Sequence, residues 1–420
     1  MNFDAIVLGG GIIGLSCALH LQDRGLSVAV LDKAEVGHGA SFGHAGLVER
    51  STVVPYAFPR RIADLWRHGF NRGSAVRFDP FYLPRLSPWL LQYWWQSAPK
   101  RLQKASQDIL PLIQNCVEEH DFLAAKTGSE ALYVDRGWIE ICRSDHTLKT
   151  AWDAAGRLRD YGLKASALDR RAVHALEPSL SSAVVGGVHW MDPKSTVNPA
   201  GVTKSYADHF ISCGGKILLG DARSLERVSR TRWQVTAADG KISAINVVLA
   251  TGAAAPEVYT PLGYRIPLAV KRGHHLHFGA ADGAALSRPV VDEENGFVLS
   301  PMAAGIRMAT GIDFSHPSSP PNLKQVRLAE KYAREVLPLG RQVEDKAWVG
   351  LRPCLPDMRP VISQAPRHPG LWFAFGHAHH GFTLGPATGR LLAEMVSGSI
   401  PFVDPRPFRA DRFGACVRFF

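Results

Sequence analysis

The sequence has few cysteines, and their spacing resembles neither a metal site nor a disulfide framework. Six cysteines are scattered over 420 residues, and no C-x-x-C pair occurs among them. Zinc modules and disulfide-stapled proteins have closely and regularly spaced cysteines. We therefore expect free thiols, no structural zinc and a reducing, cytoplasmic location.

Long apolar runs are also missing. No stretch of 18 or more uncharged apolar residues occurs, which excludes a membrane-spanning helix. The apolar segment 6–21 differs from a signal peptide, because Asp4 but no basic residue precedes it and four glycines interrupt it.

The positive charge is not concentrated in one block. The net charge of +10 comes from 48 Lys+Arg against 38 Asp+Glu, spread along the chain. Nucleic-acid binding needs a basic stripe or a known module, and neither is present, so we expect no nucleic-acid partner. With 46% hydrophobic and 20% charged residues, the chain is globular. Its length indicates two or three domains or one composite unit.

The first 32 residues predict the start of a parallel sheet. An apolar strand at 5–8 leads into a glycine turn at 9–14, a helix at 15–24 and a second buried strand at 27–32. This strand–helix–strand order predicts an α/β fold.

The rest of the chain alternates between helical and strand patterns without repeats or low-complexity linkers. Residues 37–72 read as loop, and 264–312 alternates like an antiparallel sheet. The other predicted helices are 86–97, 105–127, 147–161, 199–212 and 385–397, and the other predicted strands are 136–142, 216–219, 233–237 and 246–249.

The glycine turn has the spacing of a dinucleotide site. Gly9, Gly11 and Gly14 form G-x-G-x-x-G, and Asp32 ends the second strand. Such glycines let a pyrophosphate approach the helix N-terminus, and the acid accepts hydrogen bonds from ribose hydroxyls. The acid favours FAD or NAD over NADP.

A second glycine-rich segment, 375–390, opens into the last predicted helix. Its free N–H groups and the helix dipole suit the flavin edge on which negative charge accumulates during reduction, so this loop favours FAD. His377, His379 and His380 raise the alternative of a metal site. No carboxylate or cysteine lies close to them in the sequence, and we expect no metal.

Four motifs in this order resemble the D-amino-acid oxidase superfamily of FAD enzymes, and within it the bacterial D-amino-acid dehydrogenases and relatives acting on D-hydroxyproline. They are the turn at 9–14 with Asp32, A-T-G at 250–252, G-L-R-P at 350–353 and the loop at 376–389. The resemblance implies a Rossmann-like FAD-binding domain interleaved with an α+β substrate domain containing an antiparallel sheet. The implied segments are 1–85, 146–255 and 346–420 for FAD, and 86–145 and 256–345 for substrate.

The resemblance also implies which residues contact one FAD. The expected contacts are Gly9, Gly11, Ile12, Ile13, Gly14, Asp32, Lys33, Ser41, His44, Ala45, Gly46, Thr251, Gly252, Gly376, His377, His379, Gly381, Phe382 and Thr383. Three positions depart from the family pattern. Ala378 replaces a glycine, Cys354 replaces Ser or Thr, and His44 replaces Asn. For His44 a hydrogen-bonding role and a covalent flavin link both stay open.

Two arginines are the candidate substrate-binding residues. The resemblance implies that Arg352 holds the substrate carboxylate, because its planar fork binds a carboxylate through two parallel hydrogen bonds. The alternative is a structural ion pair. Arg272 is a weaker candidate, since it lies where the substrate sheet meets the flavin in relatives.

The implied activity is oxidation of a D-amino or D-imino acid, such as D-proline or D-hydroxyproline, by hydride transfer to flavin N5, with a quinone-type acceptor. Two alternatives stay open: a sarcosine- or glycine-type amine oxidase that uses oxygen, and a flavin-binding subunit of a larger complex. Homo- or hetero-oligomers also stay open. The aromatic and basic stretch 81–104 is either a core helix with a basic end or an element that contacts the inner membrane from the cytoplasm.

Overall fold

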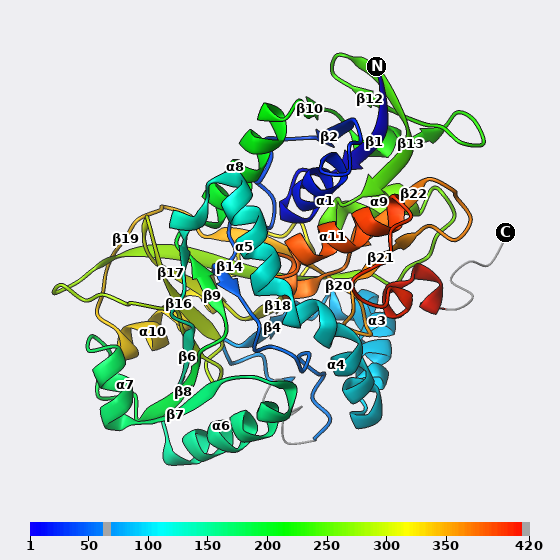
Figure 1. Cartoon of the computed structure of the whole chain (residues 1–420). Helices are drawn as coiled ribbons and strands as arrows, with labels where there is room; N and C mark the ends of the chain where they lie inside the picture. Colours follow the sequence, from blue (N-terminus) through cyan, green and yellow to red (C-terminus); the bar gives the residue numbers. More distant parts are fainter. Residues whose placement is uncertain (62–68, 414–420) are drawn as a thin grey trace.

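A computed structural model describes residues 1–61 and 69–413 and contains two large sheets (Figure 1). The first sheet has the strand order β10-β2-β1-β13-β12-β11. In addition, β22 pairs in parallel with the end of β13, and β21 pairs antiparallel with β22. Its strands are β1 (Asn2–Leu8), β2 (Val28–Asp32), β10 (Lys216–Leu219), β11 (Glu226–Arg227), β12 (Trp233–Ala237), β13 (Gly240–Leu249), β21 (Val361–Gln364) and β22 (Leu371–Phe375).

The predicted strand–helix–strand start is confirmed. β1 pairs in parallel with both β2 and β13, and β10 pairs in parallel with β2. Helix α1 (Ile12–Gln22) is apolar almost all round, because it lies between other elements and packs against α8 (Pro199–Ser212) and α11 (Gly385–Val396). These helices and the first sheet form the upper part of Figure 1.

The second sheet has eleven strands and confirms the antiparallel pattern predicted for 264–312. β14 pairs antiparallel with β17, β18, β19 and β20. The strands are β4 (Val76–Phe78), β6 (Trp138–Cys142), β7 (Ala165–Asp169), β8 (Gly186–Trp190), β14 (Ala269–Ala280), β15 (Val290–Asp292), β16 (Phe297–Met302), β17 (Gly305–Thr310), β18 (Ile312–Phe314), β19 (Leu339–Gln342) and β20 (Trp348–Cys354). A small third sheet joins β3 (Leu47–Val48), β5 (Tyr133–Val134) and β9 (Lys194–Thr196).

The strands of the second sheet come from several separate parts of the chain. β7 and β8 belong to the second sheet although they lie within 146–255, and β20 belongs to it although it lies within 346–420. β4 belongs to it as well, within 1–85. The division into FAD and substrate segments is what the family resemblance implies, and it stays a prediction.

Several helices differ from their predicted bounds. The predicted helix 105–127 is two helices, α4 (Pro99–Gln114) and α5 (Cys116–Thr127), which meet at Asn115. Helices α7 (Arg170–Leu176) and α10 (Leu323–Val336) were not predicted, and α6 spans Asp145–Leu158. α9 (Ala255–Tyr259) is a short helix after β13. Part of the predicted loop 37–72 lies outside the described residues.

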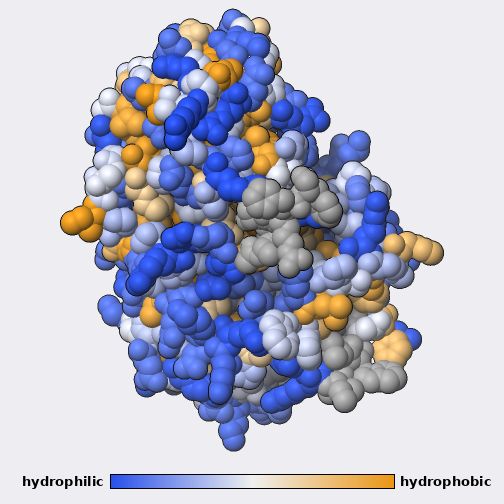
Figure 2. Space-filling model, turned by 90° about the vertical axis from the view of Figure 1, so that its right-hand side faces the viewer, coloured by the Kyte–Doolittle hydropathy of each residue, from blue (hydrophilic) through white to orange (hydrophobic). Residues whose placement is uncertain are grey.

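Helix α3 (Leu83–Gln96) buries one face and exposes the other. Leu86, Trp89 and Tyr93 are buried, while Leu91 is 67% and Trp95 55% exposed. Exposed hydrophobic residues form small groups among hydrophilic ones in Figure 2. Within the described ranges, no helix is both long enough and apolar enough to cross a membrane. The five described cysteines are free thiols, and Cys416 lies outside the described residues.

The contact between α1 and β1 leaves no room for a side chain at Gly14. A Cβ there would lie 1.8 Å from the Gly9 carbonyl oxygen. Gly14→Ala is therefore expected to destabilise the fold by about 3 kcal/mol or more, because the backbone must move. Gly156 in α6 has open space around it, so Gly156→Ala serves as the control and is expected to stabilise by about 0.5–1 kcal/mol. Chemical denaturation measures both, and an unchanged midpoint for Gly14→Ala would contradict this packing.

Candidate active site

One cavity of about 1360 Å³ lies between the two large sheets. It begins at the carboxyl ends of β1 and β2 and extends to β14, β17 and β20. Ligands of open α/β sheets bind at the carboxyl ends of the strands. Since pockets for drug-sized ligands measure about 300–1,000 Å³, this cavity has room for a dinucleotide together with a small substrate.

Most of the predicted cofactor contacts line this cavity. They are Gly9, Gly11, Ile12, Ile13, Asp32, Lys33, Ser41, His44, Ala45, Thr251, Gly252, Gly376, His377, His379, Gly381 and Phe382.

Three predicted contacts lie behind the cavity wall instead. Gly14 allows α1 to pack on the turn, and a Cβ at Gly46 would lie 2.5 Å from the Thr196 carbonyl oxygen. The Thr383 hydroxyl accepts a hydrogen bond from the Glu49 N–H at 3.1 Å. These residues shape the wall, because the motifs that point to a ligand also contain positions needed for packing.

The turn after β1 presents the N-terminus of α1 to the cavity. Gly9 has φ +105, and a Cβ there would lie 2.5 Å from the Ala250 carbonyl oxygen, so only glycine fits. Gly11 caps the helix without a side-chain hydrogen bond, and the first turn contains no acid. The Ile12 N–H donates to Ser41 Oγ at 3.0 Å. This helix end is suited to an anion.

Asp32 is positioned by the same turn. Its Oδ2 accepts from the Gly10 N–H at 2.6 Å and its Oδ1 from the Ala34 N–H at 3.2 Å. These two hydrogen bonds fix the carboxylate at the edge of the cavity. Its remaining lone pairs can accept hydrogen bonds from ribose hydroxyls. The residues therefore fit FAD: the α1 N-terminus would hold the pyrophosphate, and Asp32 would hold a ribose.

The loop from Gly376 carries a strained residue. Ala378 has φ +53, a left-handed conformation that costs a non-glycine residue about 1–2 kcal/mol, which explains why the family pattern has glycine there. His377 contacts the Thr388 hydroxyl at 3.0 Å, and burial lowers the pKa of His377 to about 3. An uncharged imidazole thus supports this loop.

His44 has hydrogen bonds at both ring nitrogens. The Gly46 N–H donates to Nδ1 and Nε2 contacts the His379 carbonyl oxygen, each at 3.2 Å. This assigns the proton to Nε2. The ring stacks on Phe382 at 5.1 Å between centroids, and burial lowers the pKa of His44 to about 4. Because both nitrogens are engaged, this arrangement favours the hydrogen-bonding role over a covalent flavin link.

Arg352 faces the cavity from β20 without a carboxylate partner among the described residues. Among the residues that the structure describes, its guanidinium donates only to the carbonyl oxygens of Thr310 and Gly311, each at 3.3 Å. Burial lowers the pKa of Arg352, and the neighbouring Cys354, Tyr56 and Glu49 oppose that shift. An arginine remains charged in a protein, so the cavity contains a cation that an anionic ligand can pair with. The alternative of a structural ion pair is not met here.

Arg272 is a correction to the sequence analysis. It is fully buried and does not line the cavity; Nη1 lies 3.4 Å from Asp313 Oδ2 and Nη2 donates to the carbonyl oxygens of Ser319 and Pro320. Strand side chains alternate between faces, and Lys271, Gly273 and His274 are the β14 residues that line the cavity. Arg272 is the structural ion pair that we had considered for Arg352.

Lys271 was missed in the sequence analysis. It is the Cα partner of Arg352 in the β14–β20 pair, lines the cavity and is only 8% exposed. Its ammonium lies 4.0 Å from the ring centre of Tyr93 and 5.5 Å from that of Trp89. Trp89 and Tyr93 both lie in the predicted helix 86–97, but nothing in the sequence indicated that this helix packs against Lys271 of β14.

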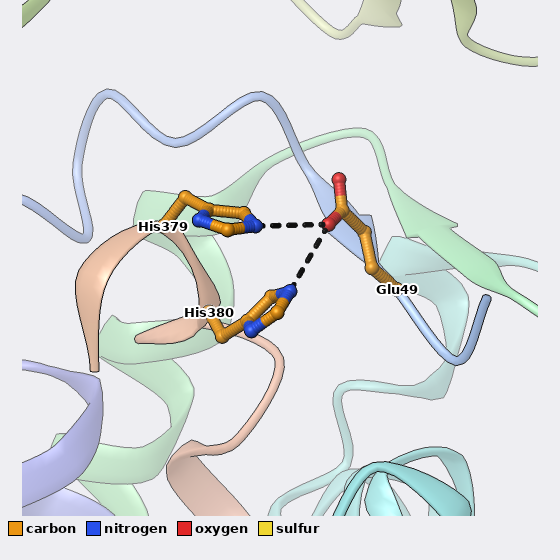
Figure 3. Close-up of side chains that lie close together, drawn as sticks. All are labelled: Glu49, His379 and His380. Atoms are coloured by element: carbon orange, nitrogen blue, oxygen red, sulfur yellow. Dashed lines mark ion pairs between the residues drawn. The ribbon is translucent and has the colours of Figure 1, made fainter. Parts of the chain in front are cut away.

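Glu49 is the second residue that sequence reasoning missed. Figure 3 shows its carboxylate facing His379 and His380, with Oε2 at 4.0 Å and 3.6 Å from the two Nε2 atoms. We had set aside a metal because no carboxylate was near these histidines in sequence, and the fold supplies one through the segment after β3. One carboxylate oxygen of Glu49 and one ring nitrogen of each histidine lie within 4.8 Å of one another, close enough for all three to contact one metal ion.

A family model described as FAD dependent oxidoreductase (DAO) matches residues 4–395. The protein is thus an FAD-dependent oxidoreductase. It belongs to the DAO family, which confirms both the resemblance and the FAD prediction.

Two curated relatives match nearly the whole chain. A D-amino-acid oxidase of Bradyrhizobium diazoefficiens is 26% identical, covering 97% of this chain and 98% of its own. D-amino acid dehydrogenase 2 of Mesorhizobium japonicum is 28% identical, covering 95% and 98%. The crystal structure of glycine oxidase from Geobacillus kaustophilus superposes with a TM-score of 0.75 at 21% identity, covering 98% of this chain and 99% of its own. That likeness shows the fold and confirms the predicted fold class.

Gly11 separates cofactor binding from folding. A Cβ at Gly11 would meet only Ser41 Oγ, at 3.4 Å, so a larger side chain projects into the cavity where the pyrophosphate would lie. Gly11→Val is expected to give a folded, colourless protein, whereas the unchanged chain is yellow. Absorption spectra and melting curves check both properties, and a fully yellow Gly11→Val protein would refute this placement.

Proposed function

We propose that the protein oxidises the bond between the α-carbon and the nitrogen of a D-amino or D-imino acid and passes the electrons to a quinone-type acceptor. The observation that carries this proposal is the unpaired guanidinium of Arg352 in the cavity. A carboxylate is the anion that its fork matches best on a small substrate. FAD supplies the two-electron acceptor when it is bound.

The names of the relatives support the D-amino-acid class. Both curated relatives carry D-amino acid in their names, and their lengths match this chain almost completely. The glycine oxidase structure contributes only its fold, because the identity is 21%. Two alternatives therefore remain for the acceptor assay to decide. In one, the protein passes its electrons to oxygen; in the other, it is the flavin-binding subunit of a larger complex.

The residues of the cavity would hold the substrate in place rather than exchange protons with it. Arg352 would pair with the carboxylate, and Lys271 beside it adds a second positive charge at the same end. The amine must be uncharged to lose a hydride, so we propose that the substrate loses its proton before the chemical step. His44, with a pKa of about 4, is uncharged at neutral pH.

The exposed face of α3 supports an acceptor at a membrane surface. Leu91 and Trp95 are exposed beside Arg101, whose guanidinium lies 4.0 Å from the Trp95 ring centre. Aromatic and basic side chains together suit the interface of an anionic bilayer. We propose cytoplasmic location with peripheral contact to the inner membrane. Homo- or hetero-oligomer formation stays a proposal.

Arg352→Ala is expected to leave the flavin bound and the melting temperature unchanged while kcat/KM falls by about 30-fold to several thousand-fold. The reason is the loss of a desolvated charge pair, which costs about 2–5 kcal/mol. Arg352→Lys is expected to recover part of the activity, because an ammonium cannot form two parallel bonds. Steady-state kinetics with D-amino acids measures the effect.

Arg272→Ala is the matched control on the neighbouring strand. It leaves Asp313 buried without its cation, so it is expected to lower the melting temperature. Normal kcat/KM in a stable, yellow Arg352→Ala protein would remove Arg352 from the substrate site.

The acceptor is tested separately. With a quinone or a redox dye, turnover is expected to exceed hydrogen peroxide formation under air several-fold. Parallel measurement of dye reduction and peroxide with the same preparation decides it. Peroxide formed at the rate of dye reduction would make the protein an oxidase, and no turnover by the isolated chain with any acceptor would favour the subunit alternative.

A further inference from the structure

Glu49 places a charged carboxylate in the same cavity as Arg352. It follows β3, lines the cavity, and its side chain is 17% exposed. Burial raises the pKa of Glu49, but His380, His44 and Thr52 outweigh that effect and hold the pKa below its ordinary value. Glu49 is therefore ionised at neutral pH.

Only one oxygen of this carboxylate has partners in the described part of the chain. Oε2 accepts from the Thr52 hydroxyl at 3.0 Å and is the oxygen that faces both imidazoles. Figure 3 shows the other oxygen, Oε1, pointing away from them. An ionised carboxylate oxygen accepts about two hydrogen bonds, so Oε1 has capacity left for a donor on a ligand.

The two histidines beside Glu49 are also incompletely paired. The Nε2 atoms of His379 and His380 are buried and have no hydrogen-bond partner among the described residues, and His380 is only 4% exposed. His379 lines the cavity together with Glu49, while His380 stands behind them. Both Nε2 atoms face Glu49 Oε2, so Oε1 is the oxygen of this group that is left for a ligand, and an aliphatic ligand would leave it unpaired.

The positions of the charges give the ligand an orientation. Arg352 and Lys271 face the cavity from adjacent positions of β20 and β14, whereas Glu49 and His379 come from the segment after β3 and the loop after β22. When the carboxylate of a substrate pairs with Arg352, a polar group on its side chain or ring can face Glu49. An acidic side chain would be repelled there.

We propose that Glu49 selects the substrate: its free oxygen accepts a hydrogen bond from a hydroxyl or an ammonium group carried by the side chain or ring of the amino acid. This inference rests on the proposed function and narrows it to substrates with a side-chain donor. A site built around a polar partner rejects the analogue that lacks it, because its own buried groups are then left unpaired.

The test uses pairs of substrates that differ in the donor alone. D-proline is compared with the 4-hydroxy-D-prolines, and D-norleucine with D-lysine, by steady-state kinetics of the flavin-loaded chain with a redox dye as acceptor. One donor-bearing substrate is expected to have at least about tenfold higher kcat/KM than its aliphatic partner. In Glu49→Ala this ratio is expected to fall to about one, mainly through KM.

Glu49→Gln distinguishes the two kinds of donor. Its amide oxygen still accepts a hydrogen bond but carries no charge, so preference for a hydroxyl is expected to survive and preference for an ammonium to be lost. Glu226→Gln, which removes a surface charge paired with Lys241, is the control and is expected to change neither ratio. Flavin content and melting temperature are checked first, and Glu49→Gln replaces Glu49→Ala if the latter loses flavin.

Equal kcat/KM within both pairs, or ratios unchanged by either Glu49 substitution, would overturn the selection by Glu49 while the proposed function stands. Failure of every amino acid to reduce the flavin would overturn the proposed function itself.

Discussion

The arrangement of the cavity depends on the pairing of β14 with β20 within the second sheet. This pairing sets Arg352 opposite Lys271, and both residues line the cavity. Arg272 is buried and does not line it. Because strand side chains alternate, a shift of β20 by one residue would turn Arg352 away from the cavity, and a shift of β14 by one residue would move Lys271 to the opposite face. We propose that this unpaired cation gives the cavity a preference for an anionic substrate.

The other charged groups of the cavity lie on different elements of the fold. The turn after β1 directs the N-terminus of α1 and Asp32 to one end of the cavity, where a dinucleotide fits. The two cations lie on the second sheet, and Glu49 lies on a segment that belongs to neither large sheet. The residues that line this one cavity come from many separate segments of the chain.

Sequence patterns predicted the parts that depend on local physics. The apolar strands, the glycine turn and the helix at 199–212 have strong local signals, and α8 covers the predicted range. Residues that act through distant partners were beyond reach. Arg272 and Arg352 are both arginines in strands, and only the tertiary pairing with Asp313 distinguishes them. Glu49 carries no motif, and its two histidines lie at the far end of the chain.

The central claim is that Arg352 recognises a carboxylate, and a substrate lacking that group tests it most directly. Anaerobic flavin reduction is measured with a D-amino acid and with its uncharged amide, in the unchanged protein and in Arg352→Ala. The unchanged protein is expected to prefer the acid by about 30-fold or more, and Arg352→Ala to lose that preference. Equal rates for acid and amide in the unchanged protein would contradict the account.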